Sequence, residues 1–122
     1  MKMQIKDFAA FTGVSVRTLH YYHEIGLLPP ACVDRSTGYR YYDEASLLRM
    51  QEILFYRELD FPLKRIEEIL SSPHYDKQKA LMDQKTLLTL KKERLERLID
   101  AIDRAAKGEP VMNVFDNSKF EA

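Results

Sequence analysis

The chain has 122 residues, of which 45% are hydrophobic and 31% are charged, and its 19 basic residues balance 19 acidic ones. This composition is typical of one compact globular domain, with room for an extended appendage, and it excludes an intrinsically disordered protein. The single cysteine, Cys32, excludes an internal disulfide and a cysteine-rich metal cage. A net charge of zero gives no global attraction to nucleic acid, so any DNA contact must depend on where individual charges lie.

No apolar run approaches the length of a bilayer-spanning helix, and the first ten residues do not have the pattern of a signal peptide. We therefore expect a cytoplasmic protein without a membrane partner.

Two short helices are predicted at the start of the chain. Apolar residues of the segment 4–11 recur at helical spacing, and Gly13 follows where a helix end often needs positive φ. Ser15 is a good N-cap for a second helix over about 16–25. The gap of about four residues is the length of a helix-turn-helix turn. Because short turns between helices are common in helical cores, this spacing alone is a weak indication of DNA binding.

The second helix offers a polar face. Leu19 should pack inward together with either Tyr22 or His23, which leaves Arg17, Thr18 and Tyr21 on other faces. These side chains suit a recognition helix, because arginine can bind guanine and hydroxyls can bind phosphate oxygens. A solvated helix face without a partner explains this helix equally well.

A β-hairpin is predicted next. The segments ACVD and YRYY flank the turn RSTG, and five of the seven tyrosines fall between residues 21 and 42. Strand alternation sends Tyr39 and Tyr41 to one face and Arg40 and Tyr42 to the other. We expect Tyr42 to lie in the core, and we expect Tyr39 and Arg40 to belong to a wing that lies along the DNA backbone.

Two further helices and one long helix complete the pattern. Asp43 should cap a helix over about 44–58, and Pro62 suits the first turn of a fourth helix that ends before Pro73. From Asp76 to about Lys107 there is neither glycine nor proline. Four apolar residues recur there at heptad spacing: Leu81, Leu88, Leu95 and Ile102. Leu98 lies on the companion seam, and together this pattern predicts a coiled coil. This division gives a first domain over 1–75, a dimerisation helix over 76–107 and a tail over 108–122.

Three runs taken together, VSVRTLHYYHEIGLLPP, GYRYY and LDFPLKRIEEIL, resemble the MerR family of bacterial transcription regulators. The likeness covers residues 3 to about 107. It implies a mainly α fold, in which a winged helix-turn-helix domain of four helices and a short β-hairpin precedes a long helix that forms an antiparallel coiled coil. It also implies a homodimer that binds an inverted repeat in a promoter spacer and distorts it so that RNA polymerase engages both promoter elements. Such recognition depends on DNA deformation, which is an established physical strategy.

Two sets of residues follow, one carried over by position from the resemblance and one taken from the heptad pattern. The DNA-facing set is Ser15, Arg17, Thr18, His20, Tyr21, Tyr22, Tyr39, Arg40, Tyr41, Lys64 and Arg65. The dimerisation set is Leu81, Leu88, Leu95, Leu98 and Ile102. One departure is Asp60, where the family usually has glycine. Aspartate tolerates left-handed backbone geometry, so we expect the turn to survive with slight strain.

The segment YDKQKALMDQK and the tail look most like the branch of the family that responds to drugs and thiopeptides, in which an effector domain begins near this tail. The chain is then either a short natural regulator or one cut before its sensor. Family metal sensors place cysteines at the start of the long helix and in the loop after it, and neither place has one here. His20 and His23 have no third ligand nearby in sequence, so neither a metal nor another cofactor is predicted.

Two other function classes were compared with this interpretation. A coiled-coil adaptor that binds protein rather than DNA is favoured by the zero net charge, and it predicts no salt-dependent DNA affinity. An enzyme would need a phosphate loop, a nucleophile elbow or a paired histidine and carboxylate, and the sequence contains none of these patterns. We therefore predict a DNA-binding protein that is not an enzyme.

Overall fold

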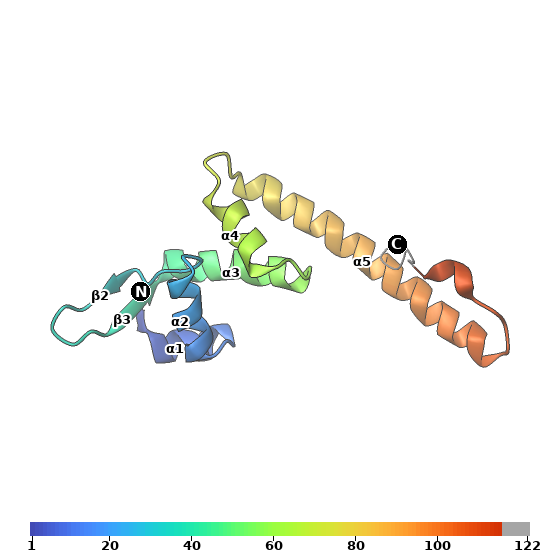
Figure 1. The fold of residues 1–122 in the computed structure, drawn as a ribbon, viewed down its shortest axis with the longest axis horizontal. Helices are drawn as coiled ribbons and strands as arrows, with labels where there is room; N and C mark the ends of the chain where they lie inside the picture. Colours follow the sequence, from blue (N-terminus) through green and yellow to red (C-terminus); the bar gives the residue numbers. More distant parts are fainter. Residues whose placement is uncertain (116–122) are drawn as a thin grey trace. The chain divides into compact units, whose positions relative to one another are not determined.

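The computed structural model describes residues 1–115 and divides into two units, Met1–Lys77 and the residues from Gln78 onward. The first unit combines short helices with a small sheet (Figure 1). In chain order its elements are β1 (Lys2–Gln4), α1 (Ile5–Thr12), α2 (Val16–Glu24), β2 (Cys32–Val33), β3 (Arg40–Asp43), α3 (Glu44–Glu58) and α4 (Leu63–Ser71). The long helix α5 (Lys77–Ala106) and a 3₁₀ turn, η1 (Met112–Val114), follow. The mainly helical, winged fold expected from the sequence is confirmed.

The helix boundaries follow from local chemistry. Gly13 ends α1 with a left-handed φ of 79°, a conformation that costs glycine little. The Ser15 hydroxyl accepts a hydrogen bond from the Thr18 N–H at 3.0 Å and so caps α2. At α3, Asp43 and Ser46 form a reciprocal capping box, because each side chain accepts a hydrogen bond from the other's backbone N–H. All three boundaries were predicted from these residues.

The Asp43 cap makes the free energy of unfolding depend on pH. Hydrogen bonds from the Ser46 backbone N–H and then from its hydroxyl hold the pKa of the Asp43 carboxyl below its ordinary value. A carboxyl whose pKa is lower in the folded protein stabilises it above the unfolded pKa, about 3.9, and that contribution disappears as pH falls through the folded pKa. Asp43→Ala should therefore lower the free energy of unfolding at pH 7, and the difference from wild type should shrink below about pH 4. Denaturant unfolding of both proteins across this pH range measures the difference in the free energy of unfolding. A difference that does not change with pH would contradict the account.

The sheet has a strand that the sequence analysis did not predict. The order is β1-β3-β2, and both pairs are antiparallel. β1 has three residues and runs directly into α1, so its own sequence has no room for a visible alternation. It pairs with β3, where Met3 lies opposite Tyr42.

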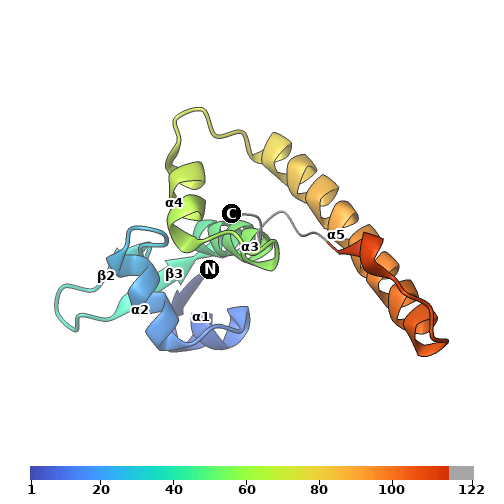
Figure 2. The ribbon, with the colours of Figure 1, turned by 45° about the vertical axis from the view of Figure 1, so that its right-hand side comes forward.

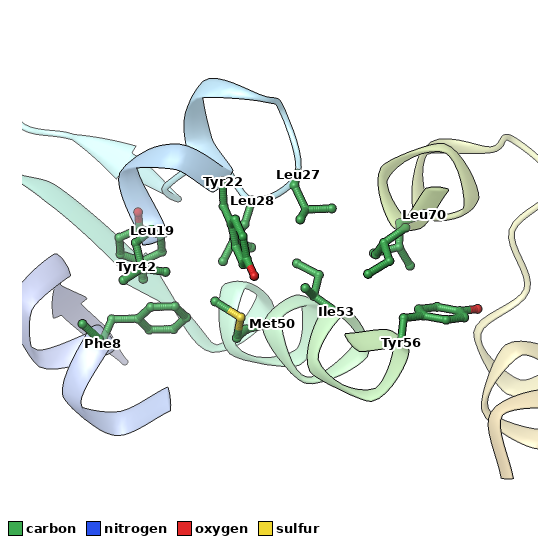
Figure 3. Packing of buried hydrophobic residues seen from close by; sticks show 12 residues of the cluster. Phe8, Leu19, Tyr22, Leu27, Leu28, Tyr42, Met50, Ile53, Tyr56 and Leu70 are labelled. Atoms are coloured by element: carbon green, nitrogen blue, oxygen red, sulfur yellow. The ribbon is translucent and has the colours of Figure 1, made fainter. Parts of the chain in front are cut away.

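The core of the first unit lies between the helices and β3 (Figure 3). Phe8 of α1 stacks on Tyr42 of β3, with ring centroids 4.5 Å apart and planes 10° from parallel. Both rings are fully buried, which confirms the core position expected for Tyr42. The other fully or nearly fully buried side chains of this core are Leu19, Tyr22, Leu27, Leu28, Met50, Ile53 and Ile66. The core therefore fixes α2 relative to the wing.

Burial leaves the Tyr42 hydroxyl without a hydrogen-bond partner among residues 1–115. Burial also raises the pKa of this phenol. An unpaired buried hydroxyl costs about 1–3 kcal/mol, and phenylalanine keeps the ring that stacks on Phe8. Tyr42→Phe should therefore raise the free energy of unfolding by about 1 kcal/mol, as urea unfolding can measure. A loss of stability of the same size would show that the hydroxyl makes a hydrogen bond in solution.

Helix α5 exposes a row of apolar side chains. Leu88, Leu95 and Ile102, at the predicted heptad spacing, are 38%, 49% and 68% exposed. Leu81 and Leu98 are half-buried. After α5 the chain turns back beside the helix (Figures 1 and 2). The Arg104 guanidinium lies 3.5 Å from the Glu109 carboxylate at this turn.

The short η1 lies in the tail that follows α5. Residues 116–122, the end of that tail, lie outside the described part of the chain. Within residues 1–115 no helix is both long and apolar enough to cross a bilayer.

Candidate nucleic-acid interface

Helix α2 carries most of the candidate site. Arg17, His20 and Tyr21 are exposed and Thr18 is half-buried. Together with Glu24 these four side chains line a shallow hollow on the outer face of the helix. The Ser15 hydroxyl also donates to the Thr18 hydroxyl at 2.9 Å, so Ser15 acts mainly as the helix cap. The outer face of α2 thus offers a guanidinium, an imidazole and hydroxyl groups to a ligand.

Tyr22 does not belong to this face, and its assignment to the DNA-facing set is corrected here. Its side chain is 1% exposed and packs in the core beside Leu19, its neighbour three residues earlier on the helix (Figure 3). The helical period allowed either Tyr22 or His23 to point inward, and the larger apolar ring took the buried position, whereas His23 is half-buried. The Tyr22 hydroxyl accepts a hydrogen bond from Arg57 at 3.1 Å.

A side-chain hydrogen bond joins the wing to the outer face of α2. Nη1 of Arg40, at the start of β3, lies 2.6 Å from Nδ1 of His20. Tyr39, the residue before β3, is 54% exposed. Tyr41 points to the side of the sheet opposite Arg40, where it is half-buried and the Lys2 ammonium lies 5.9 Å from its ring centroid. Arg40 is thus placed with α2 and Tyr41 with Lys2 of β1, whereas Tyr39 is exposed.

The start of α4 supplies a second group of cations. Pro62 is the N-cap residue of this helix rather than a member of its first turn. Lys64 and Arg65 are both exposed, and Arg65 lies 3.7 Å from Glu68, one turn further along. The preceding turn contains Asp60 at φ 62°, so the expected left-handed aspartate is confirmed. The first N–H groups of a helix have no partner within the helix and attract anions.

Arg57 is a candidate that the sequence analysis missed. It lies near the end of α3, is exposed, and lines a hollow between α2 and α4 together with Thr18, Tyr21 and Leu63. No local pattern could have placed it beside α2, because Thr18 and Tyr21 come from a helix far away in sequence. The hollow and the His20–Arg40 contact show that α4 and the wing both adjoin α2.

The arrangement of charges favours a polyanionic ligand. The exposed cations Arg17, Lys64 and Arg65 lie on elements that adjoin one another, although the chain as a whole has no net charge. Arginine and lysine at such positions bind phosphate oxygens, and arginine also reads guanine edges. Within the described residues, no group of three or more histidine, cysteine or acidic side chains could hold a metal ion.

Comparison with known proteins agrees with this geometry. Residues 3–73 match the family model described as "MerR HTH family regulatory protein", and residues 47–108 match the model described as "MerR, DNA binding". The chain is 46% identical over 104 residues to the HTH-type transcriptional activator mta of Bacillus subtilis, which covers 85% of this chain and 40% of that protein. It is 40% identical over 123 residues to the activator TipA of Streptomyces coelicolor, which covers 99% of this chain and 48% of that protein.

Among solved structures, the HTH-type transcriptional regulator SkgA of Caulobacter crescentus is similar, with a TM-score of 0.82 at 41% identity over 98% of this chain and 91% of that chain. The chain spans less than half the length of the curated relatives mta and TipA. The two family models together cover most of its residues, from the first strand to the end of α5. The chain therefore belongs to the MerR family of helix-turn-helix regulatory proteins.

Proposed function

We propose that this chain binds promoter DNA as a homodimer and regulates transcription from that promoter. Three observations carry the proposal: the exposed polar side chains on the outer face of α2, the contact of the wing with this helix through Arg40 and His20, and the hollow that α2 shares with the start of α4. In this proposal α2 enters the major groove and the two flanking elements contact the phosphate backbone on the same duplex. Residues 1–75 then form the DNA-binding domain.

Dimerisation is assigned to residues 76–107. A helix with a row of leucines at heptad spacing can bury them against a partner helix, and a second copy supplies the same row. Leu88, Leu95 and Ile102 of α5 are at least a third exposed in the single chain, so they are available for such pairing. We propose an antiparallel pair, which separates the two DNA-binding domains so that each can reach one half of an inverted repeat.

Activation is proposed to act on the shape of the DNA. Two domains held at a fixed separation by a stiff coiled coil can bind both half-sites only if the spacer between them is bent or twisted, and contacts with the deformed DNA offset the cost of deformation. A distorted spacer would let RNA polymerase engage both promoter elements. We place the protein in the cytoplasm, where promoter DNA is found in bacteria, and we propose no enzymatic activity and no cofactor for residues 1–115.

The experiment that tests this function is selection of bound fragments from the genome of the source organism with the purified 122-residue chain. The proposal predicts enrichment of fragments that contain an inverted repeat between two promoter elements. Binding should weaken steeply with salt, because each neutralised phosphate contributes about −0.9 to the slope of log affinity against log salt. Failure to enrich any fragment would favour the coiled-coil adaptor, which has no support among the relatives described above.

A further inference from the structure

The contact between the wing and α2 joins two side chains that are twenty residues apart in sequence. Nη1 of Arg40 lies 2.6 Å from Nδ1 of His20. Arg40 is half-buried at the start of β3, and His20 is exposed on the outer face of α2. Since β3 is held between β1 and β2, the Arg40 backbone is fixed relative to the helix that carries His20.

The chemistry of this contact determines which nitrogen of His20 carries the proton. A guanidinium group has N–H donors and no acceptor, so Nδ1 of His20 must accept the hydrogen bond. A neutral imidazole that accepts at Nδ1 carries its hydrogen on Nε2. The ring is therefore held as the Nε2–H tautomer, and its orientation is set by the wing.

The Nε2–H group of the ring is left as a donor. No other described residue of the chain accepts a hydrogen bond from Nε2 of His20, and the ring lies in the hollow that Arg17 and Tyr21 also line. The Nε2–H donor is oriented, has no protein acceptor, and lies on the face proposed to meet the major groove. A base edge of the DNA can supply the missing acceptor. Base edges offer acceptors at guanine N7 and O6, adenine N7 and thymine O4, whereas cytosine N4 and adenine N6 are donors.

We infer that Arg40 acts as a positioning residue for His20, and that His20 uses its Nε2–H to select a base pair with an acceptor at that point of the major groove. This inference rests on the DNA-binding function proposed above. The wing thus has two roles: it contacts the backbone through Tyr39 and its remaining guanidinium N–H groups, and it fixes the donor that α2 presents. Sequence selectivity at one base pair of each half-site then depends on a residue of the wing that does not itself touch that base pair.

Two substitutions at His20 separate the two nitrogens. In His20→Asn the side-chain oxygen can still accept from Arg40, but nothing remains at the position of Nε2. In His20→Gln the amide N–H reaches the position of Nε2, but the acceptor for Arg40 is lost. Arg40→Ala removes the positioning group, and Arg35→Ala removes an exposed arginine from the turn of the same hairpin and is the matched control.

The test measures the affinity of these full-length variants for a selected operator and for all of its single base-pair changes within one half-site. We expect His20→Asn and Arg40→Ala each to flatten the preference at the same base pair by about tenfold. His20→Gln should flatten it about as much as Arg40→Ala, because both variants lose the contact that positions the donor. Arg35→Ala should leave the preference unchanged. Replacing the purine at that base pair with its 7-deaza analogue, which lacks N7, should weaken wild type but not His20→Asn if N7 is the acceptor, and should weaken neither if O6 or O4 is.

Several results would overturn the inference. Unchanged preference in His20→Asn would show that His20 reads no base, and unchanged preference in Arg40→Ala would show that the wing does not position it. An equal loss for all sequences in His20→Asn, with a shallower salt dependence, would place the donor on a phosphate instead. In each of these cases wild type still binds its operator, so the DNA-binding proposal stands. If wild type enriches no fragment at all, that proposal fails as well.

Discussion

Replacing Leu88 and Leu95 of α5 with aspartate is expected to convert the protein into a folded monomer that binds its operator at least about 100-fold more weakly. Both side chains are more than a third exposed in the single chain, so the substitutions should leave the monomer folded. In a dimer they would place carboxylates in an apolar seam, where an unpaired charge is strongly unfavourable. Loss of the second domain removes the gain from bivalent binding, which reaches about 10²–10⁴.

The matched control is Leu90→Asp. Leu90 is 55% exposed and lies two residues from Leu88, about 200° around the helix, on the side away from the seam. Analytical ultracentrifugation at micromolar concentration should find a dimer for wild type and Leu90→Asp and a monomer for the double variant. A wild-type protein that is already monomeric, or a double variant that remains dimeric, would contradict the assignment of α5 as the dimerisation helix.

Arg17→Ala is expected to weaken operator binding by about 10- to 100-fold per half-site and to relax selectivity at one position. Arg17 is exposed in the first turn of α2, where a recognition helix contacts base edges. A bidentate contact with guanine contributes about 1–3 kcal/mol of discrimination. The variant should lose less affinity for unrelated DNA than for the operator, because phosphate contacts provide most of the non-specific binding.

Arg97→Ala removes the same charge from an exposed position of α5 and serves as the control. Competition binding of both variants to operator and random duplex separates the loss of specific affinity from the loss of non-specific affinity. Equal losses on operator and random DNA for Arg17→Ala would reassign this arginine to the backbone, and no loss at all would remove it from the interface.

Local rules predicted most of the elements of the fold. Ser15 and Asp43 bear side chains that accept hydrogen bonds from the first turn of a helix, and the structure uses both in this way. Asp60 takes the left-handed conformation expected where the family usually has glycine. These features depend on a few neighbouring residues, so the sequence alone was sufficient to predict them.

Features that depend on distant residues were not predictable in the same way. The strand β1 exists because β3 pairs with it, and three residues before a helix give no pattern of their own. Tyr22 was assigned to the DNA-facing set because of the family resemblance, yet tertiary packing buries it. The Arg40–His20 contact and the position of Arg57 beside Tyr22 likewise bring together residues from separate elements.

The central claim is that the face formed by α2, the wing and the start of α4 binds a specific promoter sequence. Footprinting of the best selected genomic fragment, at two salt concentrations and with wild type beside Arg17→Ala, tests it most directly. The account predicts protection of an inverted repeat between two promoter elements, and this protection should weaken at the higher salt concentration and in the variant. Binding that protects no defined sequence, or that is indifferent to both salt and the substitution, would contradict it.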